Sequence, residues 1–300
     1  MGFTFDDVAA AKGEAESLAA MRALIARAPR NAERIFPHIG GEEVNSDPCH
    51  VFHRYVIDFV DFPLKREPQS KTWVAMTDRE HQDALREGFV LIEYPDAVAE
   101  DWPDLLEIIA QRVKRGRSAQ NREAHARRWW KFGDRQPSLC KAIAEFDSVL
   151  AINFGALTQR ALAKMHSINI FAHTLCIFAF SSPTHFVVLQ SNVHECWARF
   201  FSSTTGDGLR YTPSDSFRNF PFPANFETDP ALEAAGEASH AFRAKLMIAR
   251  NEGLTKTYNR FHARFAVAQD IATLRTLHAQ MAAAVLTAYG CSNSKWPMRR

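Results

Sequence analysis

Even the most apolar run of the chain, residues 168–180, is only 13 residues long and contains Asn169 and His173. A helix needs about 20 consecutive apolar residues to cross a bilayer, so the sequence excludes an integral membrane protein. A shorter apolar run bounded by turn residues favours buried strands. We therefore predict a pair of strands at 168–180 and another buried strand at 148–154.

Other segments carry the periodicity of helices or of half-buried strands. Tyr55, Ile57 and Phe59 occupy every second position over 54–59, which predicts a strand with one buried face. Gly40 and Gly41 before it indicate a turn. Helices are expected over these ranges: 16–27, 78–87, 101–113, 186–200, 232–249 and 271–288.

The order of these elements predicts the fold class and the domain boundaries. With 46% hydrophobic and 23% charged residues, 300 residues suffice for about two domains. The proline-rich stretch 211–223 continues neither periodicity, so a boundary is expected near Ala224. We predict an α+β fold: a mixed or antiparallel sheet with peripheral helices, followed by an antiparallel helical hairpin.

The cysteines and histidines do not form a recognisable metal or disulfide pattern. The five cysteines include no CxxC pair, so buried free thiols are expected and no metal site is predicted. His194 and Cys196 are expected on one helix spanning 186–201, as a surface and a core residue respectively. The N-terminus lacks both a basic and an apolar signal region, so a cytoplasmic location is expected.

Motifs of the common catalytic classes are absent from the sequence. Adenine-N6 methyltransferases need an Asn/Asp-Pro-Pro-aromatic tetrapeptide, and this chain has no Pro-Pro pair. None of its ten lysines has an acidic residue two positions earlier, which excludes a (D/E)xK nuclease motif. Walker, GxSxG and HExxH motifs are also missing. The chain is therefore not expected to be an enzyme on its own.

One short segment is strongly basic although the net charge of the chain is only +2. Between residues 112 and 131, eight basic residues face a single acidic one, Glu123. This asymmetry predicts contact with a polyanion, with a merely solvated helix face as the alternative. The candidate phosphate-binding residues are Arg112, Lys114, Arg115, Arg117, Arg122, Arg127, Arg128 and Lys131.

A series of short motifs, in order along the chain, resembles the C-terminal half of the MmeI-like (type IIG/IIL) DNA methyltransferases. These are fused methyltransferase and specificity polypeptides of restriction-modification and related phage-defence systems. The motifs are GFTFDD (2–7), PRNAERIFP (29–37), GGEEVN (40–45), HRYVI (53–57), WPDL (102–105), WW (129–130), LQS (189–191), WARFF (197–201), YTPSD (211–215), FPFP (220–223) and NEGLTKTYNRFH (251–262).

This resemblance implies a DNA target recognition domain at 32–224 and a helical spacer at 225–290. Residues 1–31 would be the linker from a methyltransferase half upstream, which would bind S-adenosylmethionine, so no cofactor is expected in this chain. Residues 291–300 differ from the acidic continuation of the family, which we interpret as a truncation or frameshift. The expected function is sequence-specific binding of double-stranded DNA for a partner catalytic domain that methylates adenine.

The residues that read the bases are expected outside the basic segment, because phosphate contacts carry no sequence information directly. Arginine and glutamine can form paired hydrogen bonds with guanine and adenine edges. The candidates are Thr158, Gln159, Arg160 and Lys164 in a loop after a buried strand, and Arg210, Ser214 and Asp215. The alternatives are a connecting helix for the first group and a turn cap for Ser214-Asp215. The alternative for the whole chain is a protein-docking remnant whose basic helix contacts an acidic partner.

Overall fold

The computed structural model describes residues 3–68, 71–119, 123–133, 136–154, 161–205 and 208–291. The chain forms two compact units, and each contains two stretches of sequence. The first unit is Met1–His38 with His53–Pro137, and the second is Ile39–Phe52 with Ser138–Arg300. The boundaries expected after residues 31, 224 and 290 do not coincide with those of the two units. They remain predictions of where the linker, the recognition domain, the spacer and the tail meet.

The first unit contains a small antiparallel sheet in the order β1-β3-β2. Phe36 of β2 lies opposite Val56 of β3, so the strand predicted at 54–59 is confirmed over Arg54–Ile57. The single buried face is wrong, because Val56 and Asp58 are buried as well as Ile57 and Phe59. Its described elements are β1 (Thr4–Phe5), α1 (Asp7–Ala11), α2 (Leu18–Arg27), β2 (Ile35–Ile39), β3 (Arg54–Ile57), β4 (Lys65–Glu67), α4 (Asp78–Glu87), β5 (Phe89–Leu91), α5 (Pro103–Ile109), α6 (Arg115–Ser118) and α7 (Glu123–Arg127).

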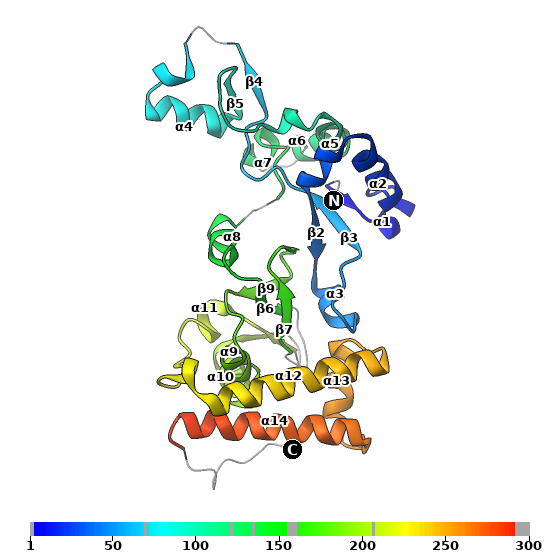
Figure 1. The fold of residues 1–300 in the computed structure, drawn as a ribbon, viewed down its shortest axis with the longest axis vertical. Helices are drawn as coiled ribbons and strands as arrows, with labels where there is room; N and C mark the ends of the chain where they lie inside the picture. Colours follow the sequence, from blue (N-terminus) through cyan, green and yellow to red (C-terminus); the bar gives the residue numbers. More distant parts are fainter. Residues whose placement is uncertain are drawn as a thin grey trace. The chain divides into compact units, whose positions relative to one another are not determined.

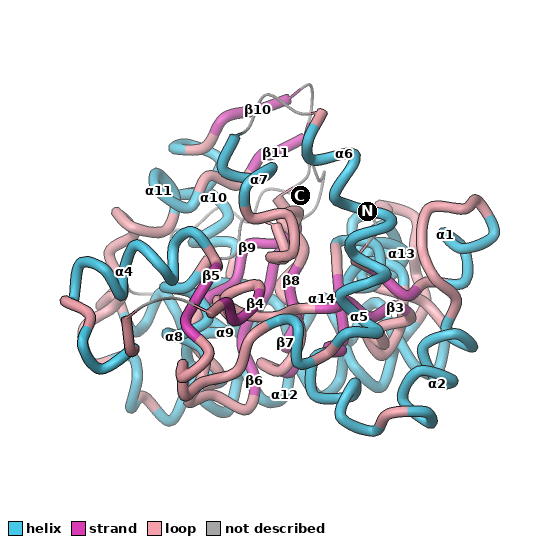
Figure 2. Tube along the Cα trace, turned by 90° about the horizontal axis from the view of Figure 1, so that it is seen from above, coloured by secondary structure: helices cyan, strands magenta, loops and turns pink. Residues whose placement is uncertain are grey.

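The helix predicted at 78–87 is confirmed with both termini, and the helix predicted at 101–113 is confirmed but extends beyond its expected end. Helix α4 starts at a capping box in which Thr77 Oγ1 and the Glu80 side chain satisfy backbone N–H groups reciprocally. It ends at Gly88 with φ +87°, where a Cβ would lie 2.3 Å from the Trp130 ring. Helix α5 begins at Pro103 and continues through a π-helical turn into α6, so that the two form one rod (Figure 2).

The second unit is built on the antiparallel sheet β7-β6-β9. Leu150 and Ile152 of β6 enter one apolar core with α9, α12 and α14, whereas Val149 and Ala151 enter another with α3 and α13. Because β6 is buried on both faces, its sequence is continuously apolar, as predicted. The strands are β6 (Ser148–Asn153), β7 (Ala163–His166), β8 (Ile170–Phe171), β9 (Leu175–Phe178), β10 (Ser203–Thr205) and β11 (Gly208–Arg210).

The helices of this unit include the predicted antiparallel pair. Helices α12 and α14 lie side by side (Figure 1) and a short helix, α13, lies in their connection. The helices are α3 (Gly41–Ser46), α8 (Pro137–Ile143), α9 (Pro183–Gln190), α10 (Asn192–Phe201), α11 (Pro213–Ser216), α12 (Pro230–Arg250), α13 (Leu254–His262) and α14 (Gln269–Ala288).

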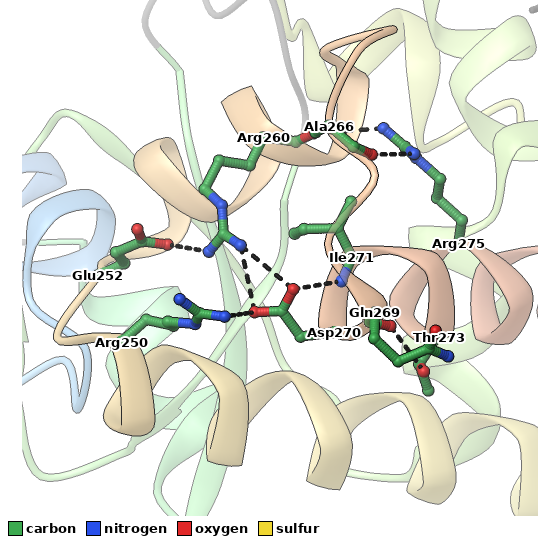
Figure 3. A network of polar contacts seen from close by, with 9 residues as sticks. All are labelled: Arg250, Glu252, Arg260, Ala266, Gln269, Asp270, Ile271, Thr273 and Arg275. Atoms are coloured by element: carbon green, nitrogen blue, oxygen red, sulfur yellow. Dashed lines mark hydrogen bonds and ion pairs between the residues drawn. The ribbon is translucent and has the colours of Figure 1, made fainter.

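An ion-pair network links the end of α12, helix α13 and the start of α14 (Figure 3). Arg260 of α13 reaches Oε2 of Glu252 at 2.8 Å and Oδ2 of Asp270 at 3.1 Å. Nη2 of Arg250 reaches the same Asp270 oxygen at 2.9 Å. Three segments of the connection are therefore held by a shared carboxylate at the start of α14.

The single helix predicted over 186–201 is wrong, because it is two helices that meet at Ser191. The Ser191 hydroxyl accepts the N–H of His194 at 3.4 Å and caps α10, which changes the helical phase. His194 is consequently buried (1% exposed) and Cys196 is exposed, the reverse of the expectation. All five cysteines are free thiols as predicted, but Cys176 alone is buried.

The turn predicted at Gly40-Gly41 is also wrong, because Gly41 begins helix α3. Oε2 of Glu43 accepts the Gly40 N–H at 2.9 Å, and both Glu42 and Glu43 lie in the first turn. Carboxylates are favoured there by the partial positive charge of a helix N-terminus. The GGEE motif thus encodes a capped helix start.

Candidate nucleic-acid interface

The basic segment 112–131 lies in the first unit and is anchored at its C-terminal end. It runs from the π-helical turn through α6 and α7 to Trp129 and Trp130, both of which are buried. Nε1 of Trp130 donates to the carbonyl oxygen of Phe62 at 3.0 Å. The end of the segment is therefore fixed to the core of its unit.

Two of its arginines make contacts within the unit. Nε of Arg112 donates to Oε1 of Glu16 at 2.7 Å. Nη1 of Arg117 donates to the carbonyl oxygen of Lys131 at 2.6 Å, and its guanidinium lies 4.9 Å from the Phe3 ring centroid. These two side chains hold the segment in place, a role that the spacing of charges did not predict.

Arg127 and Lys131 are also paired, but to different degrees. Arg127 contacts Glu87 at 3.2 Å and Glu123 at 2.9 Å, with about half of its own side chain exposed (51%). Ion pairs this exposed contribute little and are screened by salt, so a phosphate could replace either carboxylate. Lys131 donates to the Asp61 carbonyl oxygen at 3.1 Å and its side chain is only 17% exposed.

The remaining described cations are more available. Nζ of Lys114 lies 5.0 Å from the Trp129 ring centroid, which orients an exposed charge. Arg115 is exposed and Arg128 is half-buried, and neither forms an ion pair with any residue that the structure describes. Arg122 lies outside the described residues. Lys114, Arg115 and Arg128 are therefore the strongest phosphate candidates of the predicted eight.

Of the base-reading candidates in the second unit, Thr158, Gln159 and Arg160 lie outside the described residues. The prediction that Lys164 belongs to the same loop is wrong, because Lys164 is on β7, opposite Leu150 of β6. Residues of β7 alternate between buried and exposed, and Lys164 is exposed. The sequence did not predict this strand, because it has only four residues and two of them are polar.

The end of β6 lies close to Gly41, and Thr174 contacts both. The Thr174 hydroxyl accepts the Gly41 N–H at 3.2 Å, and its carbonyl oxygen accepts the Phe154 N–H at 2.9 Å. A Cβ on Gly41 would lie 2.3 Å from Nδ2 of Asn153, the last residue of β6. Any larger residue at position 41 would therefore displace the Asn153 side chain.

Leu162, which directly precedes β7, is held from two helices. The Leu162 N–H donates to Oε1 of Gln190 on α9 at 2.8 Å. Nη2 of Arg243 on α12 donates to the Leu162 carbonyl oxygen at 2.7 Å. Both polar side chains are buried, Arg243 at 3% exposure and Gln190 at 5%. The sequence offered one signal for this role: Arg243 lies four residues after Ser239 and three before Leu246, on the buried face of α12.

Neutral histidines surround Arg243. Burial, followed by the charge of Arg243, lowers the pKa of His50 to about 4, of His240 to about 4 and of His278 to about 3. His278 shares a 3.1 Å hydrogen bond with the Tyr258 hydroxyl. The positive charge of Arg243 is therefore kept beside uncharged rings.

The last group of candidates lies at the surface. Arg210 ends β11 and is exposed, and Ser214 and Asp215 are exposed on the short helix α11. The Ser214 hydroxyl donates to Oδ1 of Asp215 at 3.1 Å. Exposure makes both side chains accessible to a base edge, and their mutual hydrogen bond also stabilises the local turn.

Within the described ranges, no three His, Cys, Asp or Glu side chains are grouped as metal ligands would be. In the same part of the chain, no helix combines the length and apolarity that spanning a bilayer requires.

Comparison with known proteins finds similarity at the level of fold. No protein-family model and no curated protein matches the chain. Its structure is similar to that of the type IIL restriction-modification enzyme MmeI, solved in complex with DNA, with a TM-score of 0.61 and 18% sequence identity. The similarity covers 99% of this chain but 32% of that chain. The chain therefore has the fold of about one third of that enzyme.

Proposed function

We propose that this chain is the DNA-binding, target-recognition part of a site-specific adenine-N6 DNA methyltransferase of a restriction-modification system. The observation that carries the proposal is the fold similarity to MmeI over 99% of the chain. The ordered series of motifs that resembles the same family supports it independently. The phage-defence context and the cytoplasmic location belong to the same proposal.

In this function the chain positions DNA and does not carry out the chemistry. Lys114, Arg115 and Arg128 contact phosphates and set the register of the duplex. The candidates Thr158, Gln159 and Arg160, after β6 in the sequence, read base edges. Arg243 and Gln190 hold Leu162, the residue that precedes β7. S-adenosylmethionine and the catalytic residues belong to a partner half. The chain alone is therefore expected to transfer no labelled methyl groups to DNA.

A selection from randomised duplexes tests the proposal. The chain is expected to enrich a short common sequence above its non-specific background, because specific sites are typically bound at least about a thousandfold more tightly than random DNA. A docking fragment with a basic helix would retain all sequences alike. Equal retention of every sequence at low and moderate salt would contradict the proposal.

A further inference from the structure

Two adjacent phenylalanines lie at the surface of the second unit, at the C-terminal end of α10. The Phe200 side chain is 81% exposed and the Phe201 side chain is 42% exposed. A single apolar side chain on a protein surface is common and needs no explanation. Two neighbouring aromatic rings at one helix end form a larger apolar feature, which is a candidate contact surface.

The Phe200 ring is held by a series of aromatic contacts that leads into the core. Its centroid lies 4.9 Å from that of Phe201, with the two ring planes 75° apart. Phe201 lies 4.3 Å from Trp197, which lies 5.8 Å from Phe220. Phe220 is only 6% exposed and belongs to the apolar core around β6, α9, α12 and α14. Because edge-to-face contacts favour one ring orientation, the exposed ring is already ordered and loses little entropy when a ligand covers it.

The backbone that follows α10 is joined to the segment that contains Arg210, Ser214 and Asp215. The Ser202 hydroxyl accepts the Thr212 N–H at 3.3 Å and shares a hydrogen bond with the hydroxyl of Ser216 on α11. Helices α10 and α11 pack against each other (Figure 2). The end of α10 and these base-reading candidates therefore form one platform.

Two arginines add positive charge to this platform. Arg210 lies opposite Ser203 in the β10-β11 ladder, and Arg218 comes two residues after Ser216. Both side chains are exposed, and neither forms an ion pair within the part of the chain that the structure describes. Together with Asp215 they carry a net charge of +1. An ordered aromatic ring beside available arginines is typical of surfaces that bind unstacked nucleic-acid bases, because the ring stacks on the base and the arginines contact phosphates.

We propose that Phe200 stacks on a DNA base that has left the base stack of the duplex, with Arg210 at the neighbouring phosphate. The inference rests on the proposed function and adds a contact to it. Enzymes that modify a base take that base out of the duplex, which leaves bases without a stacking neighbour. An apolar side chain placed against such a base replaces part of the lost stacking and stabilises the distorted DNA. Since every base has an aromatic face, this contact does not depend on base identity.

Anisotropy titrations of the full chain with three duplexes of one sequence test the stacking contact. The first duplex is fully paired, the second contains one extra unpaired adenine, and the third has an abasic site in place of that adenine. The chain is expected to bind the duplex with the unpaired adenine about 5- to 150-fold more tightly than the abasic one. Equal affinities for these two duplexes would overturn the proposal.

Variants assign the contact to Phe200. Phe200→Ala, at an exposed position, should remove the preference for the unpaired adenine, and Phe200→Trp should retain it. Phe265→Ala is the matched control, because Phe265 is 93% exposed but lies between α13 and α14, away from the platform in sequence. Arg210→Gln should weaken all three duplexes alike and reduce the salt slope by about one. The assignment is wrong if Phe200→Ala keeps the preference or if Phe265→Ala also removes it.

The fully paired duplex separates this inference from the proposed function. Binding of paired DNA without any gain from the unpaired adenine contradicts the stacking contact alone, whereas failure to bind any of the three duplexes contradicts the proposed function as well. Sedimentation velocity identifies the other occupant of this surface, a second copy of the chain. If Phe200→Ala converts a dimer to a monomer, the ring is a subunit contact and the proposal is wrong.

Discussion

Arg243 shows how one residue of the helical pair holds the backbone just before strand β7, at Leu162. Its guanidinium is buried, and no carboxylate in the described part of the chain pairs with it. The Leu162 carbonyl oxygen at 2.7 Å and the Phe186 ring, whose centroid lies at 5.1 Å, compensate the charge instead. A positive charge held in this way stabilises one arrangement of the backbone around β7.

We expect Arg243→Met to lower the free energy of unfolding by about 1–3 kcal/mol, because the Leu162 carbonyl would lose its donor inside the core. It should also raise the pKa of His50, His240 and His278, since the nearby positive charge is removed. Urea denaturation and histidine NMR titration measure the two effects. Arg250→Met, at an exposed ion pair of the same helix, is the control and should cost less than about 1 kcal/mol.

The buried histidines predict loss of stability in mild acid. Their pKa values in the folded chain are lowered from about 6.5 to about 3 or 4, so the unfolded chain binds more protons between these values. Stability should therefore be highest above pH 6.5 and fall as the pH decreases, by at most about 1.4 kcal/mol per pH unit for each histidine. Denaturation at pH 7.5, 6 and 5 tests this. His278→Gln should make the dependence shallower, and a pH-independent stability would contradict it.

At the scale of elements, the approach of α3 to β6 depends on a missing side chain. Gly41→Ala would place a Cβ 2.3 Å from Nδ2 of Asn153, and we expect it to destabilise the chain by about 1–3 kcal/mol. Gly116→Ala is the matched control, because nothing lies within 4 Å of its Cβ position on α6 and alanine favours helix. It should raise stability by up to about 1 kcal/mol. Thermal denaturation of both variants measures the difference, and similar changes in both would contradict the steric argument.

For the whole molecule, affinity for DNA should depend less on the basic segment than its total charge suggests. Arg112 and Arg117 are engaged within their own unit, so Lys114, Arg115 and Arg128 are expected to carry most phosphate contacts. Replacing these three with alanine should weaken binding to all sequences alike and flatten the slope of log K against log salt by up to about three. Anisotropy titrations at several salt concentrations measure the slope. If Arg112→Ala changes the slope as much as this triple variant, the assignment of available cations is wrong.

The sequence by itself determined most of the longer elements of this protein. The strands near 54–59 and 148–154, the helix at 78–87 and the final antiparallel pair were all predicted, because periodicity and capping residues act over a few positions. The absence of catalytic motifs and the basic segment were equally visible in the sequence. The fold similarity to MmeI agrees with the family that the motifs resemble.

Only the tertiary structure decided the environment of individual side chains. His194 and Cys196 exchanged their expected positions because a serine cap changed the phase of a helix. Arg112 and Arg127 make ion pairs with Glu16 and Glu87, partners too far along the chain for a local pattern to reveal. The roles of Gly41 and Arg243 arise in the same way. Burial and hydrogen bonding depend on what the rest of the fold brings near, whereas periodicity depends only on neighbours in sequence.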